Sequence, residues 1–168
     1  RDDLIFILDN LTKGSQILIG SSMGGWLMFL ASRARPKKIA GLIGLAAATD
    51  FGNNLYNELT NKNKNEIKKN RITKYNSYGF SYFLTFKFFK DANKNNILNK
   101  PFRFNKPLIL IHGMKDDVVN YDMPKKIMEA INGKNIQIIY LKNSNHRLSK
   151  PSDLLIIKSS IDNIRSLI

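Results

Sequence analysis

Hydrophobic positions recur along this chain in two patterns, one typical of helices and one typical of buried strands. Leu4, Ile7, Leu8 and Leu11 lie on one face of a helix, which predicts an amphipathic helix over residues 2–12. Helical spacing returns in later segments, over residues 24–33, 123–131 and 152–167. Short continuous apolar runs, which predict strands covered on both faces, occupy residues 17–20, 39–47, 108–111 and 136–141.

The order of these elements predicts the fold class. Strands that alternate with helices form parallel sheets, because a parallel strand pair needs a long crossover connection and a helix supplies it. Such crossovers are right-handed. We therefore expect an α/β protein with a mostly parallel sheet flanked by helices, in a single domain covering residues 1–168.

One long segment, residues 51–106, interrupts this alternation. It begins rich in asparagine and lysine, and residues 60–70 are expected to be its flexible part. An insertion of this length within an α/β unit is usually a cap over a site. We expect a small cap, and a packed surface excursion is the alternative.

The second half of the insertion is aromatic. Alternation from Phe80 to Phe86 predicts a strand, which would form a hairpin with residues 71–75 through a turn at residues 76–79. A helix over residues 86–93 fits the same stretch equally well. The pattern leaves both interpretations open.

The formal net charge of +14 raises the question of nucleic-acid binding. The lysines are scattered among asparagines, as in residues 61–65 and 93–96, and do not gather into a stripe interleaved with aromatic residues. We therefore expect a solvated basic surface, no nucleic-acid partner and a monomer.

The sequence also limits compartment, membrane attachment and metal chemistry. It contains no cysteine, which excludes disulfides and a thiol nucleophile and suits a reducing, cytoplasmic location. No apolar run approaches the roughly 20 residues of a membrane span. Two histidines far apart, without cysteine, make a poor transition-metal site, so we expect no metal and no cofactor. The chain starts at Arg1 without a signal-peptide pattern, and we expect that start to be a cut.

The sequence Gly20-Ser21-Ser22-Met23-Gly24 carries the clearest chemical signal. It follows a predicted strand and precedes a predicted helix, which is the setting in which G-x-S-x-G forms a nucleophile elbow. The turn is so tight that small residues must flank the serine, whose hydroxyl then projects from the top of the sheet. Ser22 is thus the candidate nucleophile.

A serine hydroxyl needs a base, and only His112 and His146 are available. His146 lies in a polar loop after the strand at residues 136–141, which makes it the candidate base. His112 ends another strand, and we expect it to support the turn beneath the acid.

The base in turn needs a carboxylate that orients it. Asp116 and Asp117 directly follow the strand at residues 108–111, at the sheet edge where α/β sites are assembled. We favour Asp116 over Asp117, and Asp50 is a further alternative. The chain order Ser22, Asp116, His146 is that of α/β-hydrolases.

Three motifs carry a family resemblance: Gly-Ser-Ser-Met-Gly-Gly-Trp-Leu, His-Gly-Met-Lys-Asp-Asp-Val and Asn-His-Arg-Leu-Ser. Together they resemble the α/β-hydrolase superfamily, and are similar to small bacterial serine hydrolases related to the mitochondrial acyl-protein thioesterase and acyl-glucuronide esterase. The resemblance implies Ser22 as nucleophile, Asp116 as acid, His146 as base and the Met23 backbone N–H in the oxyanion hole. Further strands precede the elbow in that family, so the resemblance implies a partial, N-terminally truncated α/β-hydrolase fold.

These residues predict a serine esterase or thioesterase that acts through an acyl-serine on a small or acyl-bearing substrate. The aromatic part of the cap, including Tyr78 and Phe80, would offer an apolar wall to an acyl chain. The substrate contacts that we expect are Trp26, Tyr82, Phe83 and Phe86. The alternatives are a serine peptidase of the prolyl-oligopeptidase type and a basic binding module without catalysis.

Overall fold

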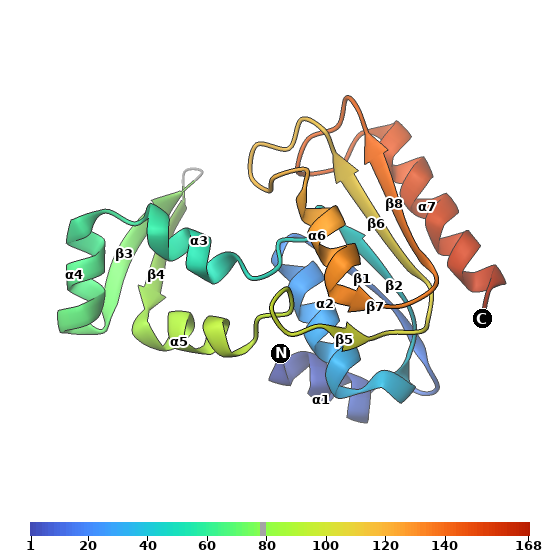
Figure 1. Ribbon diagram of the computed structural model, residues 1–168, viewed down its shortest axis with the longest axis horizontal. Helices are drawn as coiled ribbons and strands as arrows, with labels where there is room; N and C mark the ends of the chain where they lie inside the picture. Colours follow the sequence, from blue (N-terminus) through green and yellow to red (C-terminus); the bar gives the residue numbers. More distant parts are fainter. Residues whose placement is uncertain (78–79) are drawn as a thin grey trace. The chain divides into compact units, whose positions relative to one another are not determined.

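The computed structural model describes residues 1–77 and 80–168. The chain divides into two compact units, one made of residues 1–49 and 97–168 and the other of residues 50–96. Figure 1 shows the elements of both units along the chain. Among the described residues, no helix is long and apolar enough to cross a membrane.

The larger unit is built on a four-stranded parallel sheet in the order β1-β2-β6-β8. In register, Ser21 lies opposite Leu45, Leu45 opposite Ile111, and Ile111 opposite Ile139. The carboxyl ends of these strands therefore form one edge, and the loops that follow them begin close together. The strands are β1 (Gln16–Ser21), β2 (Ile39–Leu45), β6 (Leu108–Gly113) and β8 (Ile136–Leu141).

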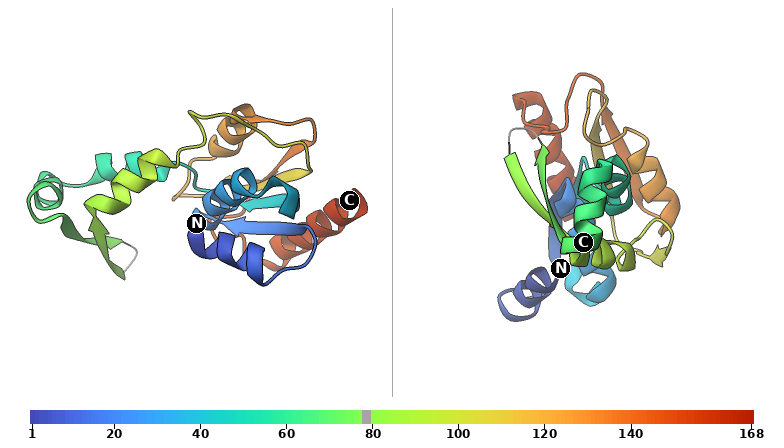
Figure 2. Two further views of the ribbon diagram at one scale, coloured as in Figure 1. Left: turned by 90° about the horizontal axis from the view of Figure 1, so that it is seen from below. Right: turned by 90° about the vertical axis from the view of Figure 1, so that its left-hand side faces the viewer.

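Helices cover both faces of this sheet (Figure 2). One face carries α2 (Met23–Ala34) and α6 (Met123–Ala130), and the other carries α7 (Pro151–Ser166). Ile164 of α7 packs in one buried cluster with Ile43 of β2 and Ile109 and Ile111 of β6. The central strands β2 and β6 are buried almost throughout, as their continuous apolar runs predict.

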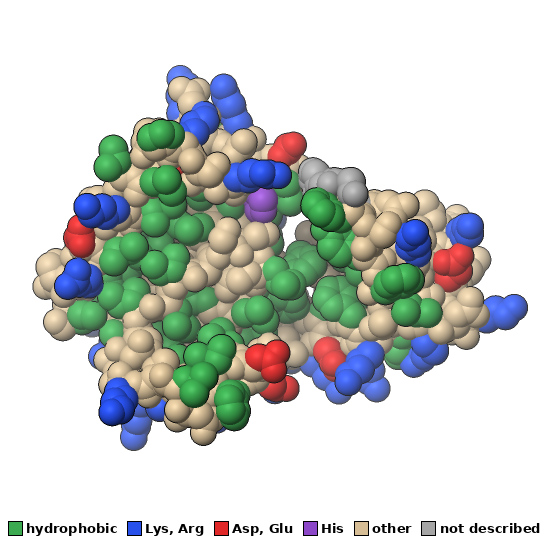
Figure 3. All heavy atoms as spheres, turned by 180° about the vertical axis from the view of Figure 1, so that it is seen from behind, with side chains coloured by type: hydrophobic (Ala, Val, Ile, Leu, Met, Phe, Trp, Pro, Cys, Tyr) green, Lys and Arg blue, Asp and Glu red, His purple; other side chains and the backbone are tan. Residues whose placement is uncertain are grey.

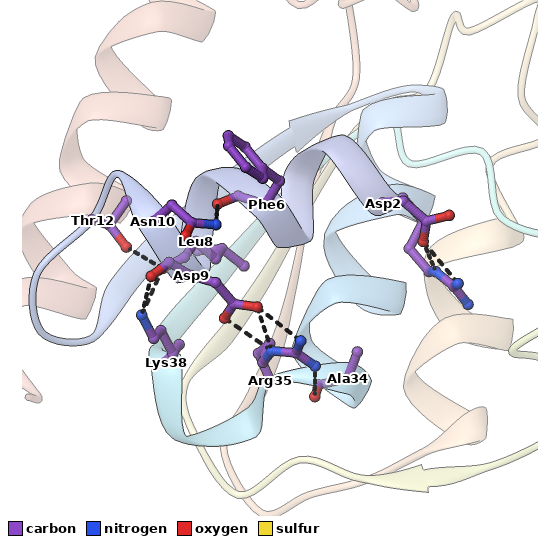
Figure 4. A network of polar contacts seen from close by, with 10 residues as sticks. Asp2, Phe6, Leu8, Asp9, Asn10, Thr12, Ala34, Arg35 and Lys38 are labelled. Carbon is purple, nitrogen blue, oxygen red and sulfur yellow. Dashed lines mark hydrogen bonds and ion pairs between the residues drawn. The ribbon is translucent and has the colours of Figure 1, made fainter.

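The first helix, α1 (Asp2–Asn10), is fastened to the chain after α2 (Figure 4). The Asp9 carboxylate accepts hydrogen bonds of 2.8–3.0 Å from the Arg35 guanidinium. This guanidinium lowers the pKa of Asp9. Lys38, in the 3₁₀ turn η1 (Pro36–Lys38), donates its Nζ proton to the Leu8 carbonyl at 2.7 Å.

Strand β1 lies at the sheet edge and, among the described residues, pairs only with β2. Figure 3 shows apolar side chains gathered over the larger unit from the opposite side to Figure 1. Exposed large apolar residues come from α1, β1 and α7, and include Phe6, Ile19, Leu154 and Leu155. A further short parallel pair joins β5 (Phe102–Arg103) to β7 (Ile131–Asn132).

The smaller unit pairs an antiparallel hairpin with three helices. Both interpretations of its aromatic stretch are confirmed, because Phe80–Thr85 forms a strand and the helix begins at Phe86. Leu59, Ile67, Leu84 and Phe89 form its buried core. Its elements are α3 (Phe51–Glu58), α4 (Asn61–Asn70), β3 (Ile72–Ser77), β4 (Phe80–Thr85) and α5 (Phe86–Lys94).

The expectation of a flexible segment at residues 60–70 is wrong, because Asn61–Asn70 is helix α4. Thr60 caps it by accepting a hydrogen bond from the Asn63 backbone N–H, and Ile67 is buried. Half of the predicted turn at residues 76–79 lies outside the described residues. The single-domain description and the covering role of residues 51–106 stay predictions.

Candidate active site

Ser22 occupies a sharp turn between β1 and α2. Its φ and ψ of 52° and −123° lie in a region that L-residues rarely adopt. The Ser22 N–H donates to the Leu45 carbonyl at 2.9 Å, and the Ser22 carbonyl accepts from the N–H groups of Gly25 and Ala48 at 3.0 and 2.9 Å. The end of β2 thus holds the turn, and a conformation that would otherwise relax persists.

The glycines of the turn have different steric roles. A Cβ on Gly20 would collide with the backbone of Gly24 and Gly25, whereas a Cβ on Gly24 would meet nothing within 4 Å among the described residues. Gly25 faces the Ala47 side chain so closely that its own Cβ would lie 2.5 Å from it. The turn therefore needs a missing side chain at Gly20 and Gly25, while at Gly24 it needs only close approach of the backbone.

This difference gives a stability prediction. Gly20→Ala is expected to lower the free energy of unfolding by roughly 1–3 kcal/mol or more, because two backbone segments must separate. Gly24→Ala, in the first turn of α2, is expected to leave it unchanged or to raise it by up to about 1 kcal/mol. Chemical denaturation of the two variants checks this, and equal losses at both positions would contradict the steric assignment.

The structure brings Ser22, His146 and Asp116 together. The His146 Nε2 atom lies 3.1 Å from the Ser22 Oγ, and the His146 Nδ1 atom lies 2.9 Å from the Asp116 Oδ2. A carboxylate can only accept, so Nδ1 carries the proton and Nε2 is left to accept from the serine hydroxyl. The Asp116 side chain is 0% exposed and that of His146 is 20% exposed.

The Asp116 carboxylate is held by its own loop. Its Oδ1 atom accepts from the backbone N–H groups of Val118 and Val119 at 2.9 and 2.8 Å. Bonds of this kind keep a buried carboxylate ionised and fix its direction. The other oxygen, Oδ2, is thereby aimed at His146.

Close contact between two loops sets the distance between the acid and the base. A Cβ on Gly113, at the end of β6, would collide with the Ser144 backbone, and the Lys115 N–H donates to the Ser144 carbonyl at 3.0 Å. The buried Ser144 hydroxyl donates to the Asp153 carboxylate at 2.6 Å. Asp153 in turn accepts from the Lys150 N–H at the start of α7. The sequence analysis missed Ser144 and Asp153; only the capping position of Asp153 behind Pro151 hints at its role.

Met23 follows Ser22 as the first residue of α2. A backbone N–H in this position has no carbonyl to bond one turn earlier in its own helix. It therefore remains available to an anion beside Ser22, as an oxyanion donor would have to be. Its role stays a prediction.

The other candidates for acid and base lie elsewhere. Asp117 is exposed, and Asp50 precedes α3 in the smaller unit. His112 is buried and contacts Val119 and Asp116. Among the described residues, no cluster of three or more histidine, cysteine, aspartate or glutamate side chains could hold a metal ion.

The predicted substrate contacts fall into two groups. Trp26 is only 5% exposed within α2, so it is a core residue that leaves little surface for a ligand. Tyr82 and Phe83 are exposed on β4, and the Phe86 ring lies 3.4 Å from the Arg71 guanidinium carbon. For these three the substrate role stays a prediction. Phe80 is also exposed, and Tyr78 lies outside the described residues.

Comparison with known proteins gives a consistent family. The sequence profile of the prolyl oligopeptidase family matches residues 6–160. Human "Palmitoyl-protein thioesterase ABHD10, mitochondrial" is 35% identical over 98% of this chain, which covers 55% of that protein. The chain thus spans about half the length of the curated relatives it matches.

Solved structures agree with the fold. "Alpha/beta hydrolase domain-containing protein 10 from mouse" superposes with a TM-score of 0.86 and 32% identity, over 98% of this chain and 67% of that one. Est1E from Butyrivibrio proteoclasticus reaches a TM-score of 0.76 at 16% identity, over 98% of this chain and 68% of its own. The architecture is therefore part of an α/β-hydrolase fold, as predicted.

The comparisons overturn one prediction. The cytoplasmic location inferred from the missing cysteines is contradicted, because the matching mammalian proteins are named as mitochondrial. A lack of cysteine indicates only that disulfides are not used, and several compartments satisfy that condition.

Proposed function

We propose, starting from the fact that the chain belongs to the prolyl oligopeptidase family, that it carries the acyl-transfer site of a serine hydrolase acting on esters or thioesters. The observation that carries the proposal is the continuous hydrogen-bonded series from the Ser22 Oγ through His146 to Asp116, with distances of 3.1 and 2.9 Å. A hydroxyl, an imidazole and a buried carboxylate in this order are the parts of an activated serine nucleophile.

In the proposed reaction the Ser22 Oγ attacks the carbonyl carbon, and the His146 Nε2 takes the hydroxyl proton. The Asp116 carboxylate stabilises the imidazolium that forms. The Met23 N–H donates to the negatively charged carbonyl oxygen. Collapse of the tetrahedral intermediate expels the alcohol or thiol, which receives the proton from His146 Nε2, and leaves an acyl-serine. Water then repeats the sequence, releases the acid and restores Ser22.

The choice of an acyl ester or thioester over a peptide amide rests on the relatives. The mammalian proteins that match nearly the whole chain are named as palmitoyl-protein thioesterases. The family name admits peptide cleavage as the competing reaction. Both reactions would use the same three side chains, so the difference must be measured on substrates.

The experiment compares one acyl group on three leaving groups: a thiol, p-nitrophenol and an amine. We expect measurable kcat/KM for the thioester and the ester and a far lower value for the amide. In parallel, a fluorophosphonate should add covalently to Ser22, which mass spectrometry of the peptide containing residues 21–26 would locate. A larger kcat/KM for the amide would favour the peptidase, and absence of a Ser22 adduct would defeat the hydrolase proposal.

A further inference from the structure

His112 is a buried histidine that the proposed reaction does not use. It lies one residue before the end of β6, and its side chain is 0% exposed. Its Nε2 atom lies 3.0 Å from the Val119 carbonyl oxygen and 3.3 Å from the Asp116 Oδ2. Its Nδ1 atom has no hydrogen-bond partner among the residues that the structure describes.

These contacts fix the tautomer of His112. The Val119 carbonyl can only accept, so Nε2 carries the proton and Nδ1 does not. Burial lowers the pKa of His112, and this effect outweighs the opposing influence of the Val119 carbonyl and the Asp116 carboxylate. The imidazole is therefore neutral near pH 7, with one N–H aimed at two acceptors.

The second acceptor is the oxygen that also holds the base. Asp116 Oδ2 lies 2.9 Å from His146 Nδ1 and 3.3 Å from His112 Nε2. Oδ1 is already occupied by the N–H groups of Val118 and Val119. His112 also bonds the carbonyl of Val119, so it fixes the loop that holds Oδ1 while it shares Oδ2 with His146.

We propose that His112 is a positioning residue for Asp116, which holds the carboxylate through Val119 and competes with His146 for its Oδ2 atom. This inference rests on the proposed function. It assigns to His112 a graded effect on the strength of the Asp116–His146 contact, in addition to support of the turn.

The competition has a direction that kinetics can detect. A donor on Oδ2 draws charge away from His146, so the carboxylate stabilises the imidazolium less strongly than it would alone. Without that donor, protonated His146 would persist to higher pH, and the acid limb of kcat/KM would move upward. The titratable groups that act on His112 are Asp116 and His146, and His112 itself stays neutral in this range.

Three variants separate the nitrogen that matters from the volume of the ring. His112→Gln can place an amide N–H where Nε2 lies, His112→Asn reaches only the position of Nδ1, and His112→Phe fills the space without a donor. We expect the Gln variant to keep the wild-type pH midpoint and kcat within a few-fold. The Asn and Phe variants should lose about ten- to hundred-fold in kcat with little change in KM. Their midpoint should rise by roughly half a pH unit or more.

The outcomes are distinguishable. Equal behaviour of the Gln and Asn variants would show that the Nε2 contact is not the cause. A folded Phe variant with the wild-type pH profile would overturn the proposal as well. Absence of fluorophosphonate labelling at Ser22 in the wild type would instead defeat the proposed function.

A spectroscopic measurement tests the inference without any turnover. The ¹⁵N chemical shifts of the wild-type histidines should show His112 as a neutral Nε2–H tautomer from about pH 5 to pH 8. A charged imidazolium near pH 7, or a proton on Nδ1, would remove the donor from Oδ2 and end the argument, whether or not any variant folds.

Discussion

Replacing Ser22 by alanine is expected to lower kcat for ester hydrolysis by about 10⁶-fold, the typical cost of deleting a serine nucleophile. Alanine keeps the Cβ atom, so the strained φ of 52° and the hydrogen bonds to Leu45 and Ala48 should be retained. The remaining rate would come from substrate binding and the oxyanion donors. Steady-state hydrolysis of a fluorogenic ester, with circular dichroism as the check on folding, measures the loss.

Ser21 supplies the matched control, because it is the exposed neighbour in the same motif. Ser21→Ala should keep kcat within about two-fold of the wild type. Adding His146→Ala to Ser22→Ala should cost little more, because residues that act as a unit are not additive. A further large loss in the double variant would mean that His146 acts on the substrate independently of Ser22.

Asp116→Asn is expected to lower kcat about 10⁴-fold with a small effect on KM. Asparagine keeps the volume of the buried side chain but removes the charge that stabilises the imidazolium. Its amide N–H can also face the His146 Nδ1, which would then lose its proton, and Nε2 would become a donor unable to accept from Ser22. A pH profile of kcat/KM alongside the steady-state rates checks this result.

The control for this prediction is Asp117→Asn, which changes an exposed carboxylate one residue away. It should leave kcat within about two-fold. If Asp117→Asn caused the larger loss, the acid would have been assigned to the wrong residue despite the 2.9 Å contact between Asp116 and His146.

The sequence could predict the three-residue site because the sheet is parallel. Parallel strands end at one edge, so residues soon after Ser21, Gly113 and Leu141 had to meet there. Spacing alone could not separate Asp116 from Asp117. What separates them is the turn in which the N–H groups of Val118 and Val119 bind the Asp116 carboxylate.

Other parts of the molecule left weaker signals. Helix α4 is almost entirely polar, and its one buried residue, Ile67, gives no periodicity to detect. The indole of Trp26 could not be told from a substrate contact by its position near the elbow, and the structure buries it. The Ser144–Asp153 pair and the shared Oδ2 of Asp116 depend on contacts between distant loops, which no local pattern encodes.

The conformation of Ser22 has a consequence for engineering. A side chain held at φ 52° and ψ −123° costs about 1–3 kcal/mol, a sizeable part of a typical net stability of about 5–15 kcal/mol. Glycine would adopt the same backbone without strain, so the residue best suited to heat resistance here is one that cannot form an acyl intermediate. A screen for thermal tolerance alone would therefore select inert variants at this position, and it has to be paired with a screen for turnover.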